Sequence, residues 1–196
     1  MMLRTHQAAG ALAAALYLAS QHVPALSASG ALGLCAGYLA APLPDVDNPN
    51  SVPARVLAPL AWGLETARVA HRTLTHSVWV IAALWFLVQR AHGAHLDGVA
   101  LYPILMAAWI GMASHPAVDL LTKAGVPLFW PLGRKWHFRL AWFTADGPWD
   151  RVWHAAFLVA LIPVVVYWGA PTTPVLQHVL DLAHRAWSAV PAHWSV

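Results

Sequence analysis

Five apolar segments alternate with polar loops along the chain, at residues 7–23, 26–43, 74–90, 99–121 and 152–169. Each approaches the roughly 20 residues that a helix needs to cross the hydrocarbon core of a bilayer. Glycine and alanine are frequent in the first two segments, which permits close helix packing. The pattern predicts an all-α fold: a polytopic helical membrane protein with about five transmembrane helices, in one domain over residues 1–196.

Two further segments have the pattern of helices that lie on a membrane surface. In residues 52–69, Leu57, Leu60 and Leu64 recur near helical spacing, while Arg55 and Arg68 fall elsewhere around the helix. Residues 174–190 form the second candidate, which either lies on the surface or crosses the membrane. We therefore expect amphipathic interfacial helices beside the spans.

The composition supports a membrane location. Hydrophobic residues make up 59% of the 196 residues and charged residues 10%, whereas a soluble domain carries about 25% charged residues. The 12 tryptophans fit, because indole favours the water–lipid boundary. The single cysteine, Cys35, excludes an internal disulfide and a thiolate metal cluster, and we expect it to be a small buried apolar residue.

The distribution of basic residues predicts an orientation. With a cytoplasmic N-terminus, nine of the eleven Lys and Arg residues fall in cytoplasmic loops, as the positive-inside rule requires. We expect a multi-pass protein of a bacterial inner membrane whose first apolar segment is retained. Membrane lipids are then the expected partners; nothing in the pattern favours nucleic acid, and the oligomeric state stays open.

This topology gathers side chains that can bind a metal at one membrane face, the cytoplasmic one. The candidates come from loops and helix ends that are far apart in the sequence. They are His6, Asp45, Asp47, His71, His76, His115, Asp119 and Asp150.

His115 and Asp119 are separated by four positions, so on a helix they are neighbours on one face and can contact one metal ion. Pro116 disfavours a helix interior, and we expect it in the first turn of a helix capped by Ser114. An aspartate at the end of an apolar segment is costly and indicates function. The alternative is a polar pair that bonds neighbouring helices.

Asp45 and Asp47 lie in a turn rich in proline and asparagine. Aspartates in turns often cap backbone N–H groups. We expect at least one of the two carboxylates to bind a metal directly, while the other caps the turn or bridges.

His71 and His76 are five positions apart, which separates them by about 140° on a regular helix. They converge if His71 precedes the helix and His76 opens it, with Thr73 or Thr75 as the N-cap.

Histidine and aspartate without cysteine favour zinc, with manganese or ferrous iron next, over calcium or magnesium. So many ligands can hold two or three ions, and multinuclear sites of this kind cleave phosphate esters. Nearby basic side chains can hold phosphate oxygens, although membrane orientation and headgroup contact also explain them. They are Arg68, Arg72, Lys123, Arg134, Lys135 and Arg139.

Several segments together resemble one family. They are THQAAG at 5–10, LPDVDNPNS at 43–51, HRTLTHS at 71–77 and the stretch 114–131. They are similar to the YdjM-type, LexA-regulated, membrane-bound metal-dependent hydrolases, and the similarity covers about residues 5–150. That family is distantly similar to zinc phospholipases C and single-strand-specific zinc nucleases, which are helical and use His/Asp trinuclear zinc.

The resemblance implies an inner-membrane protein of the SOS response with a divalent-metal hydrolase site. Position by position it points to His6, Asp45, Asp47, His71, His76, His115 and Asp119, and Asp150 falls where the family tends to have an acidic residue, more often glutamate. Pro116 departs from the usual apolar residue after the histidine.

The leading hypothesis is a phosphoester hydrolase that acts on a lipid phosphate or phospholipid at the cytoplasmic leaflet. Asp45 or Asp119 would bridge ions, and Arg72 would steady the phosphate. The alternative is a metal-binding membrane protein without turnover, in transport or a stress response. A covalent role for His115 lacks the other elements of membrane lipid phosphatases, and no His-Glu-x-x-His motif supports an intramembrane protease.

Overall fold

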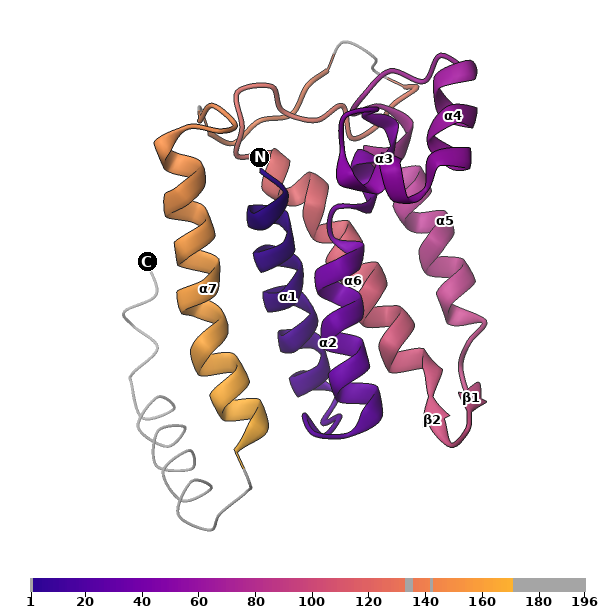
Figure 1. The fold of residues 1–196 in the computed structure, drawn as a ribbon, viewed down its shortest axis with the longest axis vertical. Coiled ribbons are helices and arrows are strands. Elements are labelled where there is room, and N and C mark those ends of the chain that lie inside the picture. The colour runs from indigo at the N-terminus through magenta and orange to yellow at the C-terminus, as the bar shows by residue number, and fades with distance from the viewer. Residues whose placement is uncertain (1, 133–135, 142, 171–196) are drawn as a thin grey trace, which may run out of the picture.

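A computed structural model describes residues 2–132, 136–141 and 143–170 of the chain. Five principal helices form a bundle (Figure 1): α1 (Leu3–Ser20), α2 (Ala28–Ala40), α5 (Val78–Gln89), α6 (Leu101–Asp119) and α7 (Pro148–Gly169). Shorter elements are η1 (Leu43–Asp47), α3 (Val52–Val56), α4 (Ala58–Thr66), η2 (Leu74–His76) and the antiparallel strands β1 (His95–Leu96) and β2 (Val99–Ala100).

The order of packing determines which helices reach the centre of the bundle. Helices α1, α2 and α6 contact one another, α7 packs against α1, and α5 packs against α6. The elements η1, α3 and α4 lie at one end of this bundle together with the loop that follows α6, while the β1–β2 hairpin lies at the other end (Figure 1).

Small residues allow the three central helices to approach closely, as the composition of the first segments predicts. Ala14 of α1 and Ala107 of α6 are fully buried, and they pack with Leu18 in the core. A Cβ atom added at Gly111 of α6 would collide with the backbone of Gly37 in α2. The backbones of α2 and α6 therefore touch where both residues lack a side chain.

The prediction of five spans is supported only in part. A helix forms within or overlapping each of the five apolar segments, but within the described ranges α6 and α7 are the helices that are long and apolar enough to cross a bilayer. Helices α2 and α5 have 13 and 12 residues, which is about 20 and 18 Å at 1.5 Å per residue. Proline and asparagine in 42–50 follow the end of α2 at Ala40, and the turn at residues 71–77 delays the start of α5 to Val78.

The interfacial helix expected over residues 52–69 is broken. It forms as α3 and α4, which meet at Leu57, and Pro53 and Pro59 open the two helices near their first turns. The second candidate, residues 174–190, lies outside the described residues. Cys35 was expected to be buried but is exposed on α2, since the outer face of a bundle in a membrane can be as apolar as its core.

Apolar side chains cover the outer faces of the bundle. Among those that are more than half exposed are Phe86, Leu87, Val159, Ile162 and Val166. An exposed apolar surface of this kind marks an interaction with a membrane or a partner.

Candidate metal centre

Seven of the eight predicted ligand residues form one cluster at the end of the bundle that carries η1 and α4. His6 comes from the first turn of α1, Asp45 and Asp47 from η1, His71 and His76 from the segment before α5, and His115 and Asp119 from the end of α6. They form three overlapping groups in which ligand atoms lie within 4.8 Å of one another. The groups are His6–Asp45–His115, His76–His115–Asp119 and Asp45–Asp47–His71.

The last turns of α6 supply the centre of the cluster. His115 and Asp119 are both fully buried, and His115 Nε2 lies 3.8 Å from Asp119 Oδ2. Pro116 was expected in the first turn of a helix, but α6 continues through it to Asp119. The position is near the C-terminus of the helix, so the proline removes one backbone hydrogen bond without displacing the two side chains from one face.

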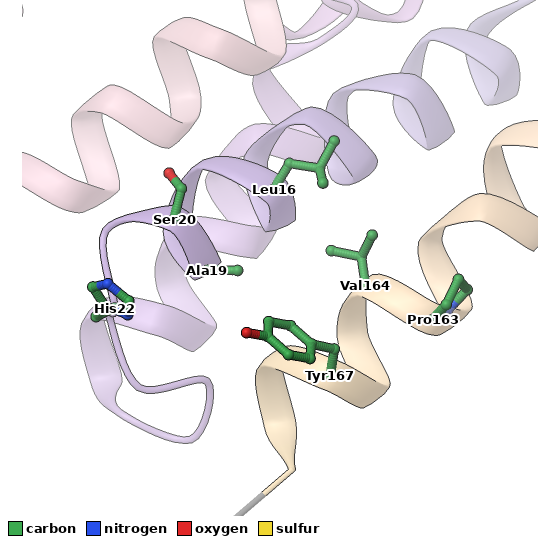
Figure 2. A pocket seen from close by; sticks show the side chains of 7 residues that line it. All are labelled: Leu16, Ala19, Ser20, His22, Pro163, Val164 and Tyr167. Carbon is green, nitrogen blue, oxygen red and sulfur yellow. The ribbon is translucent and has the colours of Figure 1, made fainter. Parts of the chain in front are cut away.

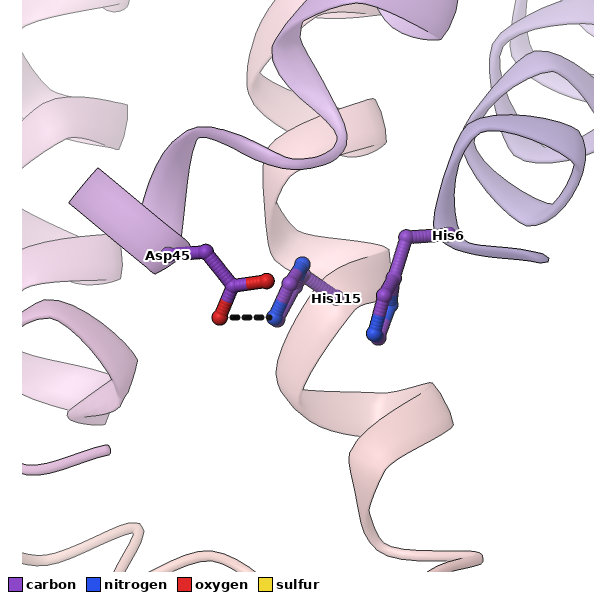
Figure 3. Close-up of side chains that lie close together, drawn as sticks. All are labelled: His6, Asp45 and His115. Carbon is purple, nitrogen blue, oxygen red and sulfur yellow. Dashed lines mark ion pairs between the residues drawn. The ribbon is translucent and has the colours of Figure 1, made fainter. Parts of the chain in front are cut away.

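The η1 turn directs its two aspartates to different neighbours. Asp45 points toward His115, with 3.3 Å between Asp45 Oδ1 and His115 Nε2 (Figure 3). His6 stacks on the other side of the His115 ring, with 3.6 Å between the ring centroids. Asp47 instead faces the segment before α5, where its Oδ1 lies 2.7 Å from His71 Nδ1.

The segment 71–77 brings its two histidines together by avoiding a regular helix. His71 lies in a turn, His76 ends the short helix η2, and the two rings are 5.7 Å apart. Neither Thr73 nor Thr75 caps the following helix, because Ser77 takes that position and accepts a hydrogen bond from the Val80 N–H. The hydroxyl of Thr75 is thereby free to bond elsewhere in the cluster.

Three imidazoles carry buried nitrogens that lack a hydrogen-bond partner within the described part of the chain: both nitrogens of His6, and Nε2 of His76 and of His115. A buried polar atom without a partner costs about 1–3 kcal/mol. His115 Nδ1 donates to the Ala41 carbonyl at 2.9 Å, so Nε2 is the nitrogen that carries the lone pair in the neutral ring. Basic nitrogens beside carboxylates are the donor set that zinc accepts, so the residues fit a divalent metal.

The environment favours the forms of these side chains that bind metals. Burial, followed by the charge of His115, lowers the pKa of His76 to about 3, so its ring is neutral at pH 7. Burial alone would raise the pKa of Asp45, but the close approach of the His115 ring outweighs it and lowers that pKa to about 2. His71 is the exception, because the hydrogen bond that it donates to Asp47 raises its pKa and favours the protonated ring.

Arg72 borders the cluster. Its guanidinium lies 3.0 Å from Asp119 Oδ2 and donates to Thr122 Oγ1 at 3.4 Å, and its side chain is 17% exposed. The backbone of Arg72 adopts a left-handed conformation with φ of 64°, and its N–H donates to Asp47 Oδ2 at 3.0 Å.

The other predicted basic residues that the structure describes take no comparable position. Arg68, Lys123 and Arg139 are exposed, while Arg134 and Lys135 lie outside the described residues. Sequence reasoning also missed Thr75 and Thr122, whose hydroxyls bond within the cluster. The position of Thr75, directly before a candidate histidine, was the available signal.

Asp150 does not join any of the three groups found among the described residues. It is buried in the first turn of α7. Its carboxylate accepts a hydrogen bond from the Met2 N–H at 3.2 Å, and its backbone carbonyl accepts one from the Thr5 hydroxyl at 3.4 Å. His154 Nδ1 donates to the Arg4 carbonyl at 3.1 Å. These contacts attach the start of α1, and hence His6, to α7.

A cleft of about 450 Å³ opens far from this cluster (Figure 2). It lies between the last turn of α1 and the second half of α7, where Leu16, Ala19, Val164 and Tyr167 line it. Along α1 the cleft is about 20 Å from His6, given 1.5 Å per residue. It therefore takes no part in the chemistry of the cluster.

Comparison with known proteins identifies the family. The family model described as YdjM inner membrane protein matches residues 1–190. The chain belongs to the YdjM family. This confirms the resemblance carried by the segments around the candidate ligands.

Two curated YdjM relatives match the chain over 100 residues. The inner membrane protein YdjM of Escherichia coli (strain K12) and that of Shigella flexneri are each 36% identical to it. The match covers 50% of this chain and 47% of each relative, so the chain spans about half the length of the curated YdjM proteins that it matches. No solved structure matches the chain.

Proposed function

We propose that this chain is a multi-pass, metal-dependent hydrolase of the bacterial inner membrane that cleaves a phosphoester at the cytoplasmic leaflet. One observation carries the proposal. Buried imidazole nitrogens lie between Asp45 and Asp119, and they have no hydrogen-bond partner among the described residues. A protein without a ligand for these atoms would leave their desolvation uncompensated.

The donor atoms indicate the metal. Imidazole nitrogen and carboxylate oxygen suit zinc best, with manganese or iron as alternatives. Three overlapping groups of donors support two or three ions rather than one. When bound, such cations supply Lewis-acid chemistry and a nucleophilic water near neutral pH.

The side chains of the chain itself define where a substrate phosphate would lie. Asp45 and Asp119 face the same imidazoles from opposite elements, η1 and α6, so each is placed to contact more than one ion. Arg72 is the one predicted cation seen at the cluster within the described residues, and its side chain is partly exposed. A planar guanidinium binds phosphate oxygens in a fixed geometry, so Arg72 orients the phosphate and stabilises its negative charge.

The surroundings of the cluster favour an amphiphilic substrate. Helix α4 lies at the same end of the bundle (Figure 1) and buries no residue, and Leu60 and Trp62 are more than half exposed. Apolar residues at this level fit the boundary between lipid tails and headgroups. The excess of Lys and Arg in the loops at this end supports a cytoplasmic location, and together these features support a lipid phosphate as substrate.

Phosphate release tests the proposal. Detergent-purified protein loaded with zinc should release inorganic phosphate or a phosphorylated headgroup from mixed micelles of phosphatidic acid or phospholipid, and chelator-treated protein should not. Hydrolysis that is unchanged after complete removal of the metal would overturn the proposal. Stoichiometric metal without hydrolysis of any phosphoester would favour the non-enzymatic alternative.

Arg72→Gln should lower the rate of this hydrolysis by about 100-fold or more, the size of effect seen when one preorganised electrostatic contact to the reacting group is lost. Arg68→Gln is a matched control, because Arg68 also has a left-handed backbone, with φ of 54°, but is exposed. Equal rates for the two variants would remove Arg72 from the catalytic machinery.

Metal binding should also appear in the stability of the fold. Zinc at about 1,000 times its dissociation constant would stabilise the folded state by about 4 kcal/mol. We expect the thermal midpoint of the detergent-solubilised protein to fall after treatment with a chelator and to recover with zinc. A thermal midpoint that changes neither with the chelator nor with zinc would argue against a bound metal.

A further inference from the structure

The carboxylate of Asp47 is fully buried and accepts three hydrogen bonds. Its Oδ1 accepts from His71 Nδ1 at 2.7 Å, and its Oδ2 accepts from the Arg72 N–H at 3.0 Å and from the Thr75 hydroxyl at 2.6 Å. An ionised carboxylate has no proton to donate, so each of these protons belongs to the partner. Asp47 therefore fixes the direction of the bonds around it.

The direction of the hydrogen bond from Thr75 to Asp47 determines which ring nitrogen of His76 carries the proton. A hydroxyl has one proton, and Thr75 gives it to Asp47. The 2.9 Å contact between Thr75 Oγ1 and His76 Nδ1 must therefore use the proton of Nδ1 and a lone pair of the hydroxyl. In the neutral ring, Nε2 is then bare.

The bare nitrogen faces the centre of the cluster. His76 Nε2 lies 3.7 Å from Asp45 Oδ1 and 3.9 Å from Asp119 Oδ2. It is buried and has no hydrogen-bond partner among the described residues. In the neutral ring of His115, Nε2 is bare as well, because Nδ1 donates directly to the Ala41 carbonyl.

We propose that Asp47 and Thr75 are positioning residues, which hold His76 in the tautomer whose Nε2 faces the metal. Asp47 then acts on the metal through Thr75 and His76, in addition to orienting His71 and the backbone of Arg72. The inference rests on the proposed metal site. Partners of this kind orient a ligand ring and raise its basicity.

The tautomer can be measured without metal and without turnover. In protein labelled with ¹⁵N-histidine and freed of metal, the ¹⁵N chemical shifts distinguish a protonated from a bare ring nitrogen, and His76→Gln identifies the signals of His76. We expect a protonated Nδ1 in the wild type and a mixture of tautomers in Thr75→Val. A wild-type His76 protonated at Nε2 would overturn the proposal even if the variant does not fold.

Metal affinity provides the second test. Thr75→Val keeps the shape of the side chain but removes the hydroxyl, and we expect zinc to bind about 10- to 100-fold more weakly. Thr75→Ser restores the hydroxyl and should restore the affinity. Thr73→Val is the matched control, since the Thr73 hydroxyl bonds only to the nearby Ala70 carbonyl among the described residues.

The outcomes separate this inference from the proposed function. Wild-type protein that binds no zinc would contradict the proposed function, while the tautomer of metal-free His76 still tests the positioning role. Zinc binding that is equal in wild type, Thr75→Val and Thr75→Ser would overturn the positioning role and leave the metal site in place.

Discussion

Asp119→Asn is expected to lower the zinc affinity of the purified protein by well over tenfold. The carboxylate lies within 4 Å of ring nitrogens of His6, His76 and His115, so the substitution removes the negative charge that these three imidazoles share. Loss of a residue that only supports a ligand already costs about 10- to 100-fold, and Asp119 would itself be a direct ligand at the proposed site. Elemental analysis after dialysis against a zinc buffer measures the effect.

Asp97→Asn is the control for this experiment. Asp97 is exposed in the turn between β1 and β2, at the other end of the bundle, and asparagine tolerates its left-handed backbone. This variant should keep the metal content of the wild type. An Asp119→Asn protein with undiminished zinc, folded as judged by its thermal midpoint, would contradict the ligand set around α6.

Gly111→Ala is expected to destabilise the bundle although it adds a single methyl group. The new Cβ would meet the backbone oxygen, carbon and Cα of Gly37, and backbone atoms cannot move aside as a flexible side chain does. Overpacking a filled core costs about 1–3 kcal/mol, and a collision between two helix backbones lies at the upper end. The thermal midpoint in detergent should fall clearly below that of the wild type.

The same substitution at Gly63 should leave the stability of the bundle unchanged or raise it. Gly63 lies inside α4, and a Cβ there would meet nothing within 4 Å. Alanine is favoured over glycine inside a helix by about 1 kcal/mol, so Gly63→Ala should keep or raise the midpoint. If both variants behaved alike, close contact between α2 and α6 would not be what holds the bundle together.

The sequence predicted the members of the cluster better than their arrangement. Spacing of four positions placed His115 and Asp119 on one face, and this needs only the geometry of a helix. It could not show that Pro116 falls in the last turn of α6, because a proline is compatible with either end of a helix. The sequence also left open which side chains Asp45 and Asp47 contact, since this depends on which elements η1 packs against.

The fold was predictable at the level of five apolar helices but not of their lengths. Hydrophobicity does not distinguish a residue inside a helix from one in the turn that follows it, so the segments 26–43 and 74–90 appeared long enough to span while α2 and α5 are shorter. Asp150 shows a second limit. An acidic residue near a predicted site can support a neighbouring helix, and its contacts with Met2 and Thr5 join positions almost 150 residues apart.

Those contacts between the first turns of α1 and α7 affect when, during synthesis, the candidate ligands come together. During synthesis, the side chains of α7 that hold the first turn of α1 follow that turn by almost 150 residues. The donors of α6 appear late as well. At the proposed metal site, a nascent chain would therefore present isolated, weak ligands, and tight capture of an ion would wait until α7 has docked.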